Sequence, residues 1–130
     1  MVITVSKTIK FIPEFNGNKD LPPADQISVY YKNPTFTLRQ RFRGKTETKA
    51  RADVNGNVEG IDISFHSDDI GLLKGLIEKI ENVQYEDCNG THSINNAVEL
   101  LEAPREYGGL IDEILRELNK AINSDVPEKN

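Results

Sequence analysis

Val58-Glu-Gly-Ile-Asp-Ile-Ser-Phe-His-Ser-Asp-Asp-Ile-Gly-Leu-Leu-Lys-Gly-Leu-Ile-Glu-Lys-Ile80 is the stretch in which the spacing of apolar residues changes. In its first part apolar and polar residues alternate, as in a half-buried strand. After Ser67 the apolar residues follow helical spacing, at Ile70, Leu73, Leu76, Ile77 and Ile80. Ser67 followed by Asp68 and Asp69 fits a helix N-cap with acidic residues in the first turn. The stretch therefore predicts a strand followed by a helix.

Immediately upstream, Asn55-Gly56 separates two candidate strands, Lys49–Val54 and Val58–Phe65. An Asn-Gly pair between two such runs is a strong local signal for a β-hairpin. The same loop resembles the start of a calcium-binding EF-hand loop, which needs Gly at its sixth position and Glu at its twelfth. Val58 and Ser64 occupy those positions, so the hairpin interpretation is preferred and no metal site is predicted.

The N-terminal part predicts two further strands. Ile3, Val5, Ile9 and Phe11 fall on alternate positions, and Ile27–Tyr31 is rich in β-branched and aromatic residues. The loop between them contains Asn16-Gly17-Asn18, which indicates a turn. Thr35–Phe42 fits either a short helix, which is preferred, or a strand, because its apolar residues share one parity.

The C-terminal part predicts helices. Val83–Cys88 is a short connection or strand, and Asn89-Gly90 is a turn. Ser93 is the expected cap of a short helix through Leu101, and Pro104 fits the first turn of a last helix. The apolar stripe of that last helix consists of Leu110, Ile111, Ile114, Leu115, Leu118 and Ile122.

Because strands come first and helices second, the sequence predicts an α+β fold rather than alternating βαβ units. The expected architecture is an N-terminal antiparallel sheet of about four strands, including the Asn55-Gly56 hairpin, packed with two to three C-terminal helices. Residues 1–124 are expected to form a single domain, since 130 residues suit one core. Residues 125–130 are expected to be a flexible tail.

Composition and cysteine content indicate a soluble protein of a reducing compartment. Cys88 is the only cysteine, so no internal disulfide can form, and the N-terminus lacks the apolar core of a signal peptide. The net charge of −5 is uneven: residues 32–65 carry seven basic and four acidic residues, whereas 66–130 carry six basic and fourteen acidic ones. This distribution does not indicate general nucleic-acid binding, which usually needs a basic domain.

The sequence contains no recognisable catalytic, cofactor or metal-binding constellation. Acidic neighbours disfavour the thiolate of Cys88. The two histidines, His66 and His92, show no metal-ligand spacing. No phosphate-binding or nucleophile motif occurs. We therefore expect a protein that is not an enzyme and needs no cofactor.

The most unusual local feature is a basic and aromatic segment, residues 30–51, on an otherwise acidic chain. Arginine and tyrosine are enriched in protein interfaces, so a partner-binding surface is the leading functional interpretation. Its candidate residues are Tyr30, Tyr31, Phe36, Arg39, Arg41 and Arg43. Two alternatives stay open: a solvated face whose arginine stems cover the core, and a module that binds single-stranded nucleic acid.

Several loop signals together resemble small proteins encoded beside the tail genes of tailed bacteriophages. They are Phe11-Ile-Pro-Glu-Phe-Asn-Gly-Asn18, Leu21-Pro22, the Ile-Ser-Val run at Ile27 and Asn33-Pro34-Thr35. The C-terminal half is similar as well, from the helix at Asp69 to the closing Glu128-Lys129-Asn130. The similarity spans most of the chain.

This resemblance implies a tail-assembly chaperone or a minor tail-module protein. Chaperones of this kind keep the tape-measure protein soluble and recruit tail-tube subunits. The implied partners are therefore other phage tail proteins, with self-association possible in principle and no membrane involved. The implied location is the host cytoplasm, or the virion if the protein is instead a structural subunit of the tail or neck.

Overall fold

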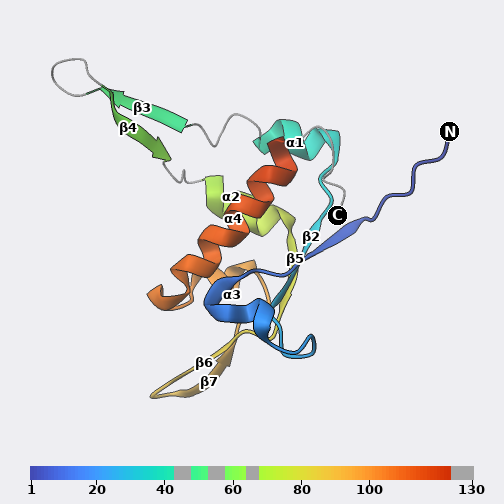
Figure 1. Cartoon of the computed structure of the whole chain (residues 1–130). Coiled ribbons are helices and arrows are strands. Elements are labelled where there is room, and N and C mark those ends of the chain that lie inside the picture. The colour runs from blue at the N-terminus through green and yellow to red at the C-terminus, as the bar shows by residue number, and fades with distance from the viewer. Residues whose placement is uncertain (43–47, 53–57, 64–67, 124–130) are drawn as a thin grey trace.

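The computed structural model describes residues 1–42, 48–52, 58–63 and 68–123, of which 48–52, 58–63 and 68 are described by their backbone alone. A three-stranded antiparallel sheet packs against helices, and two separate β-hairpins complete the structure (Figure 1). The predicted α+β class is confirmed. The expected tail, 125–130, and the expected turn at Asn55-Gly56 lie outside the described residues.

The main sheet has the order β1-β2-β5, formed by β1 (Thr8–Phe11), β2 (Ser28–Lys32) and β5 (Ile77–Glu81). One face of the sheet is apolar and points to the helices. There Ile9 lies opposite Tyr31, and Val29 lies opposite both Phe11 and Ile80. The sheet is thus built from one N-terminal hairpin and a strand that arrives from the middle of the chain.

The predicted helix through Ile80 is wrong in its second half. Helix α2 (Asp68–Leu76) ends at Leu76, and Ile77 begins β5 with no loop between them. The apolar spacing of three residues in this strand comes from a register shift in its pairing with β2. Tyr30 lies opposite Lys79, whereas the next residue, Tyr31, lies opposite Ile77. Glu78 is therefore an extra residue, so Ile77 and Ile80 both face the core although their spacing has no period of two.

The predicted first strand is shorter than expected, because β1 begins at Thr8 rather than Ile3. Its partner β2 ends at Lys32, and the following Asn33 closes the ladder by donating its backbone N–H to the carbonyl of Lys7 (2.9 Å). The chain before Lys7 has no partner strand among the described residues. Ile3 and Val5 are 72% and 71% exposed.

Two hairpins lie outside the main sheet. The predicted hairpin strands pair as β3 (Thr48–Ala52) and β4 (Val58–Ile63), in a ladder separate from β1-β2-β5. A second hairpin, of β6 (Gln84–Asp87) and β7 (Gly90–Ser93), surrounds the predicted turn at Asn89-Gly90. The main sheet therefore contains β5 in the place that the sequence assigned to the Asn55-Gly56 hairpin.

Helix α1 (Phe36–Phe42) shows that the segment open to either interpretation is helical. Helix α3 (Ala97–Leu101) is capped by Asn96, whose side chain accepts a hydrogen bond from the Glu99 N–H (2.9 Å). The predicted cap Ser93 instead ends β7. Pro104 precedes a short 3-10 turn, η2 (Arg105–Tyr107), and helix α4 (Gly108–Asn123) follows.

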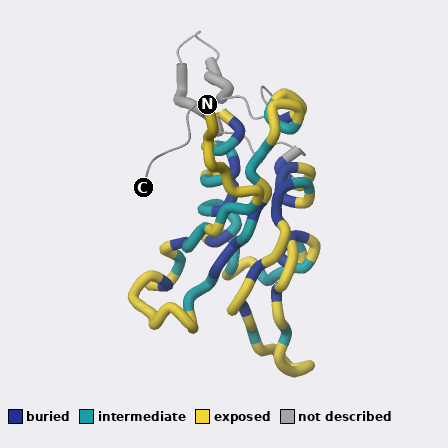
Figure 2. The backbone as a smooth tube through the Cα atoms, turned by 90° about the vertical axis from the view of Figure 1, so that its right-hand side faces the viewer, coloured by how far each residue is buried: buried dark blue, intermediate teal, exposed yellow. Residues whose placement is uncertain are grey.

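The apolar stripe of α4 forms the centre of the core, as its spacing predicts. Five of its residues are buried: Leu110, Ile114, Leu115, Leu118 and Ile122, while Ile111 is half-buried. They form one cluster with buried residues of the sheet, α1, α2 and α3. Buried and exposed positions alternate along the central elements in Figure 2, as expected for elements with one face on a shared core.

The loop between β1 and β2 contains a 3-10 segment, η1 (Phe15–Asp20), organised around a buried asparagine. Asn16 and Gly17 adopt positive φ of 49° and 73°, which turns the chain inward at Asn18. The Asn18 amide donates to the carbonyls of Pro13 (2.8 Å) and Ile27 (3.1 Å), and its oxygen accepts from the Ile27 N–H (2.6 Å). The Asn18 side chain thus links the start of the loop, at Pro13, to its end, at Ile27.

Two glycines of α2 make room for the aromatic ring that anchors α1. A Cβ atom at Gly75 would lie 3.3 Å from the Phe42 ring, and one at Gly71 would lie 3.9 Å from it. Phe42 is buried. The absence of side chains at these two positions lets α1 lie close to α2.

Replacing Gly75 by leucine is expected to lower the free energy of unfolding by about 1–3 kcal/mol, because the new side chain occupies the space of the Phe42 ring. Chemical denaturation of both proteins measures the change. Gly71→Ala is the matched control: its methyl group meets Phe42 at an ordinary contact distance, and alanine favours the helix by up to about 1 kcal/mol. Equal stability of the two variants would contradict this account of the α1–α2 contact.

Candidate interaction surface

The structure divides the predicted partner-binding residues among three environments. Tyr31 belongs to the core, at 3% exposure, and its hydroxyl donates to the Glu117 carboxylate of α4 (2.6 Å). Tyr31 therefore joins the sheet to α4 and is not available to a partner in the folded protein. Arg43 lies outside the described residues.

Tyr30 is half-buried on the opposite face of the sheet, between the exposed residues Lys10 and Lys79. The ammonium groups of Lys10 and Lys79, from the two neighbouring strands, lie 5.8 and 4.5 Å from its ring centre. A hydrogen bond to Glu81 is the main cause that raises the pKa of the Tyr30 hydroxyl, and desolvation and the Glu81 charge act in the same direction. Tyr30 is thus the centre of a mixed-charge row across the sheet.

Helix α1 has an inner and an outer face. Leu38 packs against the core, and Arg39 donates from Nε to the carbonyl of Ile122 near the end of α4 (3.0 Å). That contact satisfies a carbonyl of the last helical turn, a favourable position for a cation. Arg39 therefore has a structural role in fixing α1.

The outer face of α1 consists of Phe36, Thr37, Gln40 and Arg41, all exposed. The Phe36 side chain is 73% exposed. The Arg41 guanidinium lies 5.3 Å from the ring centre of Phe42. Of the six predicted residues, Phe36 and Arg41 are the two that are exposed on α1, where they lie about 140° apart around the helix axis. We call these two residues the α1 surface.

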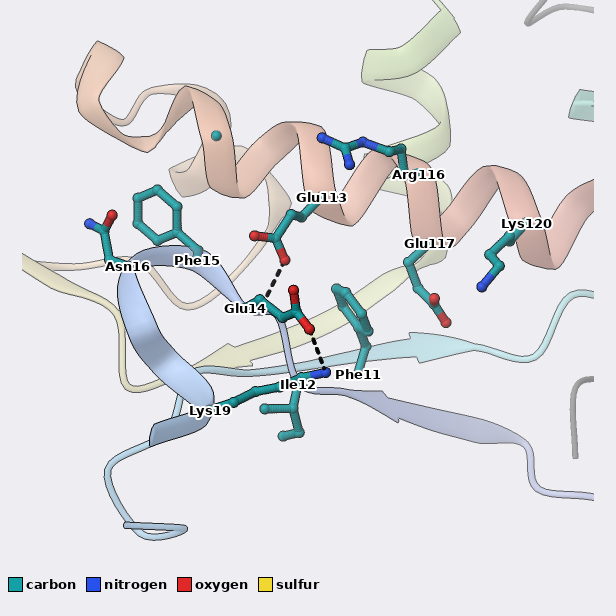
Figure 3. A pocket seen from close by; sticks show the side chains of 11 residues that line it. Phe11, Ile12, Glu14, Phe15, Asn16, Lys19, Glu113, Arg116, Glu117 and Lys120 are labelled. Atoms are coloured by element: carbon teal, nitrogen blue, oxygen red, sulfur yellow. Dashed lines mark hydrogen bonds and ion pairs between the residues drawn. The ribbon is translucent and has the colours of Figure 1, made fainter. Parts of the chain in front are cut away.

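A groove that the sequence did not predict runs between α4 and the chain from Phe11 to Lys19 (Figure 3). It has a volume of about 730 Å³, and Phe11, Ile12 and Phe15 contribute its apolar side chains. Its charged lining comprises Glu14, Lys19, Glu113, Arg116, Glu117 and Lys120. The Glu14 backbone N–H donates to Glu113 (2.7 Å), joining the two walls at one end.

The groove could not be found from sequence because its two walls are remote along the chain. Only the charged face of α4 was visible as a pattern, and a charged helix face is usually solvated. The alternation of Ile9 and Phe11 predicted that the other wall is a strand, but it did not predict which helix would pack beside that strand.

The remaining candidates for chemistry lie on the β6–β7 hairpin. Cys88 is exposed near its turn, and His92 lies 2.9 Å from the Asp87 carboxylate while its ring stacks on Tyr85. The hydrogen bond from His92, followed by that from the Asn89 N–H, lowers the pKa of Asp87. Within the described residues, no three His, Cys, Asp or Glu side chains gather to hold a metal ion. His66 lies outside them.

Comparisons with known proteins do not identify the chain: no protein-family model, curated protein or solved structure matches it. In the described part of the chain, no helix is both long and apolar enough to cross a membrane.

Proposed function

We propose that this protein acts by binding other proteins, as an accessory factor in the assembly of a phage tail, rather than as an enzyme. The observation that carries the proposal is the α1 surface, where an aromatic ring that is 73% exposed and an exposed arginine lie on the same short helix. Aromatic residues and arginine are the side chains most enriched in interface hot spots.

The way α1 is held supports this function. Phe42 fills the space over the two α2 glycines, Leu38 packs on the core, and Arg39 binds the end of α4. The outer face is therefore presented on a fixed support, which lowers the entropy lost when a partner binds. Helix α1 contains no acidic residue, so we expect a partner surface with apolar and acidic character.

The tail setting rests on the resemblance of the loop and capping signals to proteins encoded beside tail genes. In that setting the expected partners are the tape-measure protein and the tail-tube subunit, bound in the host cytoplasm. A chaperone leaves before the particle is finished, whereas a structural tail or neck subunit stays in the virion. Mass spectrometry of purified particles distinguishes the two, because a chaperone should be absent or scarce.

Nucleic-acid binding is a second candidate, favoured by the position of Tyr30 between Lys10 and Lys79 on the face of the sheet opposite the core. Aromatic rings flanked by cations can stack with bases. Glu78 and Glu81 on the same strand as Lys79 oppose phosphate binding, so this candidate ranks second. A titration with single-stranded DNA at two salt concentrations tests it, since phosphate contacts give steep salt dependence.

The double variant Phe36→Ala/Arg41→Glu is expected to weaken binding of the tape-measure protein or the tail-tube subunit at least tenfold, the effect of losing a typical hot spot. Purified partners from the same genome and biolayer interferometry measure the affinities. Arg105→Glu is the matched control, because Arg105 is an exposed arginine outside α1. Arg39 is left unchanged because its loss would disturb α1 itself.

Failure of the unmodified protein to bind either partner would contradict the tail assignment. Equal affinity of the double variant and the unmodified protein would show that the α1 surface is not the binding site. Retention of the thermal unfolding transition in the double variant ensures that a loss of affinity reflects the surface and not the fold.

A further inference from the structure

Strand β1 leaves one edge of the main sheet open. It pairs with β2 on one side, and within the described residues no strand pairs with its other side. An open edge exposes unpaired backbone N–H and C=O groups and can accept another strand. The groove of Figure 3 borders this edge, since Phe11 and Ile12 line it together with α4.

Residues 1–7 carry the side chains that such an edge requires. Met1, Val2, Ile3 and Val5 are all more than two-thirds exposed, at 113%, 94%, 72% and 71%. Met1, Ile3 and Val5 share the parity of Ile9 and Phe11, whose side chains pack against the core. Asn33 donates hydrogen bonds to the carbonyls of Ser6 (3.0 Å) and Lys7 (2.9 Å), and the chain before Ser6 projects away from the body of the molecule in Figure 1.

The segment and the edge match each other in an antiparallel arrangement centred on Ser6. Met1 then lies opposite Phe11, Ile3 opposite Ile9, and Thr4 opposite Thr8, which gives two apolar pairs and one pair of threonines. Val2 and Val5 lie opposite Lys10 and Lys7 in this register. A shift of one residue would place apolar residues opposite polar ones. Centring on Lys7 instead would place that lysine opposite itself, and like charges in this position are destabilising.

Within one chain this pairing would need a tight hairpin at Val5-Ser6-Lys7. That loop contains no Gly, Asn, Asp or Pro, and a β-branched valine resists the positive φ angles that short hairpin turns use. In the structure the segment is accordingly extended and not folded back. The same strand pairing between two chains needs no turn, which is the condition under which identical segments are exchanged.

We propose that two copies of this chain form a two-fold dimer by exchanging residues 1–4, which add to the open edge of β1 in the partner. Each copy gives and receives one strand, so the two sheets join edge to edge through an isologous contact. Met1 of one copy enters the groove beside Phe11 of the other, and the bend at Lys7 lies next to the two-fold axis. This interface is separate from the α1 surface, so it does not depend on the proposed function.

Sedimentation velocity of the full chain over a dilution series tests the association. We expect a species of twice the 14.6 kDa chain mass, and a weakening of the dimer by at least tenfold in Ile3→Lys and in Thr4→Pro. Both changes lie in an exposed segment and leave the core intact. Val2→Ser is the matched control, because Val2 belongs to the other parity and its replacement should leave the dimer unchanged.

Cross-linking tests the register. In a Cys88→Ser background, Ser6→Cys places two thiols opposite each other across the axis, whereas Lys7→Cys places them apart. We expect faster oxidation of the Ser6→Cys protein to a covalent dimer. A protein that is monomeric at all concentrations, a dimer insensitive to Ile3→Lys and Thr4→Pro, or preferential cross-linking of Lys7→Cys would each overturn the proposal. So would a monomer whose residues 1–4 are protected from hydrogen exchange, since the hairpin would then close within one chain.

Discussion

Replacing Asn18 by alanine is expected to lower the free energy of unfolding by about 3–5 kcal/mol, from the loss of three hydrogen bonds to buried or half-buried backbone groups. Asn18 is 1% exposed, and its amide joins Pro13 on one side of the loop to Ile27 on the other. Alanine leaves two carbonyls and one N–H without these partners. Urea denaturation with a constant m-value measures the loss.

Lys19→Ala is the control for Asn18→Ala, because it changes the next residue of the same 3-10 segment. Lys19 forms an ion pair with Glu14 (3.3 Å), but both side chains are more than half exposed, so its loss should cost less than about 1 kcal/mol. If Asn18→Ala were as mild as Lys19→Ala, the loop would not depend on the buried amide, and its conformation would have another cause.

The second large effect is expected at the centre of the core, where Leu118→Ala should cost about 2–5 kcal/mol. Leu118 is fully buried on the inward face of α4 and belongs to the hydrophobic core cluster of the described residues. The shorter side chain leaves a cavity whose lining loses its contacts. The total stability of a domain is only about 5–15 kcal/mol, so the variant should unfold at markedly lower temperature and urea concentration.

Arg116→Ala is the control for the core variant, since Arg116 lies two residues away on the exposed face of the same helix. Alanine also favours a helix slightly more than arginine does, so the change should stay within about 0.5 kcal/mol of zero. A loss below about 1 kcal/mol for Leu118→Ala would contradict the placement of the α4 stripe in the core.

The helical stripe of α4 and the strand Ile27–Tyr31 could be predicted from sequence because each carries a long or chemically distinctive pattern. The error at Ile77–Ile80 shows where this reasoning fails. A single extra residue, Glu78, changes the parity of the strand, and the remaining spacing of three residues imitates a helix. Only the partner strand, nearly 50 positions earlier, determines which structure forms.

The same limit applies to the candidate site. The basic and aromatic composition of residues 30–51 marked a segment, but composition does not say which side chains point outward. Tyr30 and Tyr31 are neighbours in sequence and lie on opposite faces of a strand, so one is in the core and the other is not. Arg39 and Arg41 diverge in the same way on α1. The structure therefore assigns Tyr31 and Arg39 structural roles, leaves Phe36 and Arg41 exposed on α1 and Tyr30 half-buried on the sheet, and does not describe Arg43.

The direct junction of α2 and β5 also limits how the gene can vary in length. Elsewhere a loop can absorb an added or lost codon, as at the exposed turn around Asn89. Between Leu76 and Ile77 there is no loop. One inserted residue would either shift β5 along β2, turning Ile80 to the solvent and Lys79 to the core, or rotate α2 by about 100° against the Phe42 ring. Natural variants of this protein should differ in length at its hairpin tips and keep this junction invariant in length.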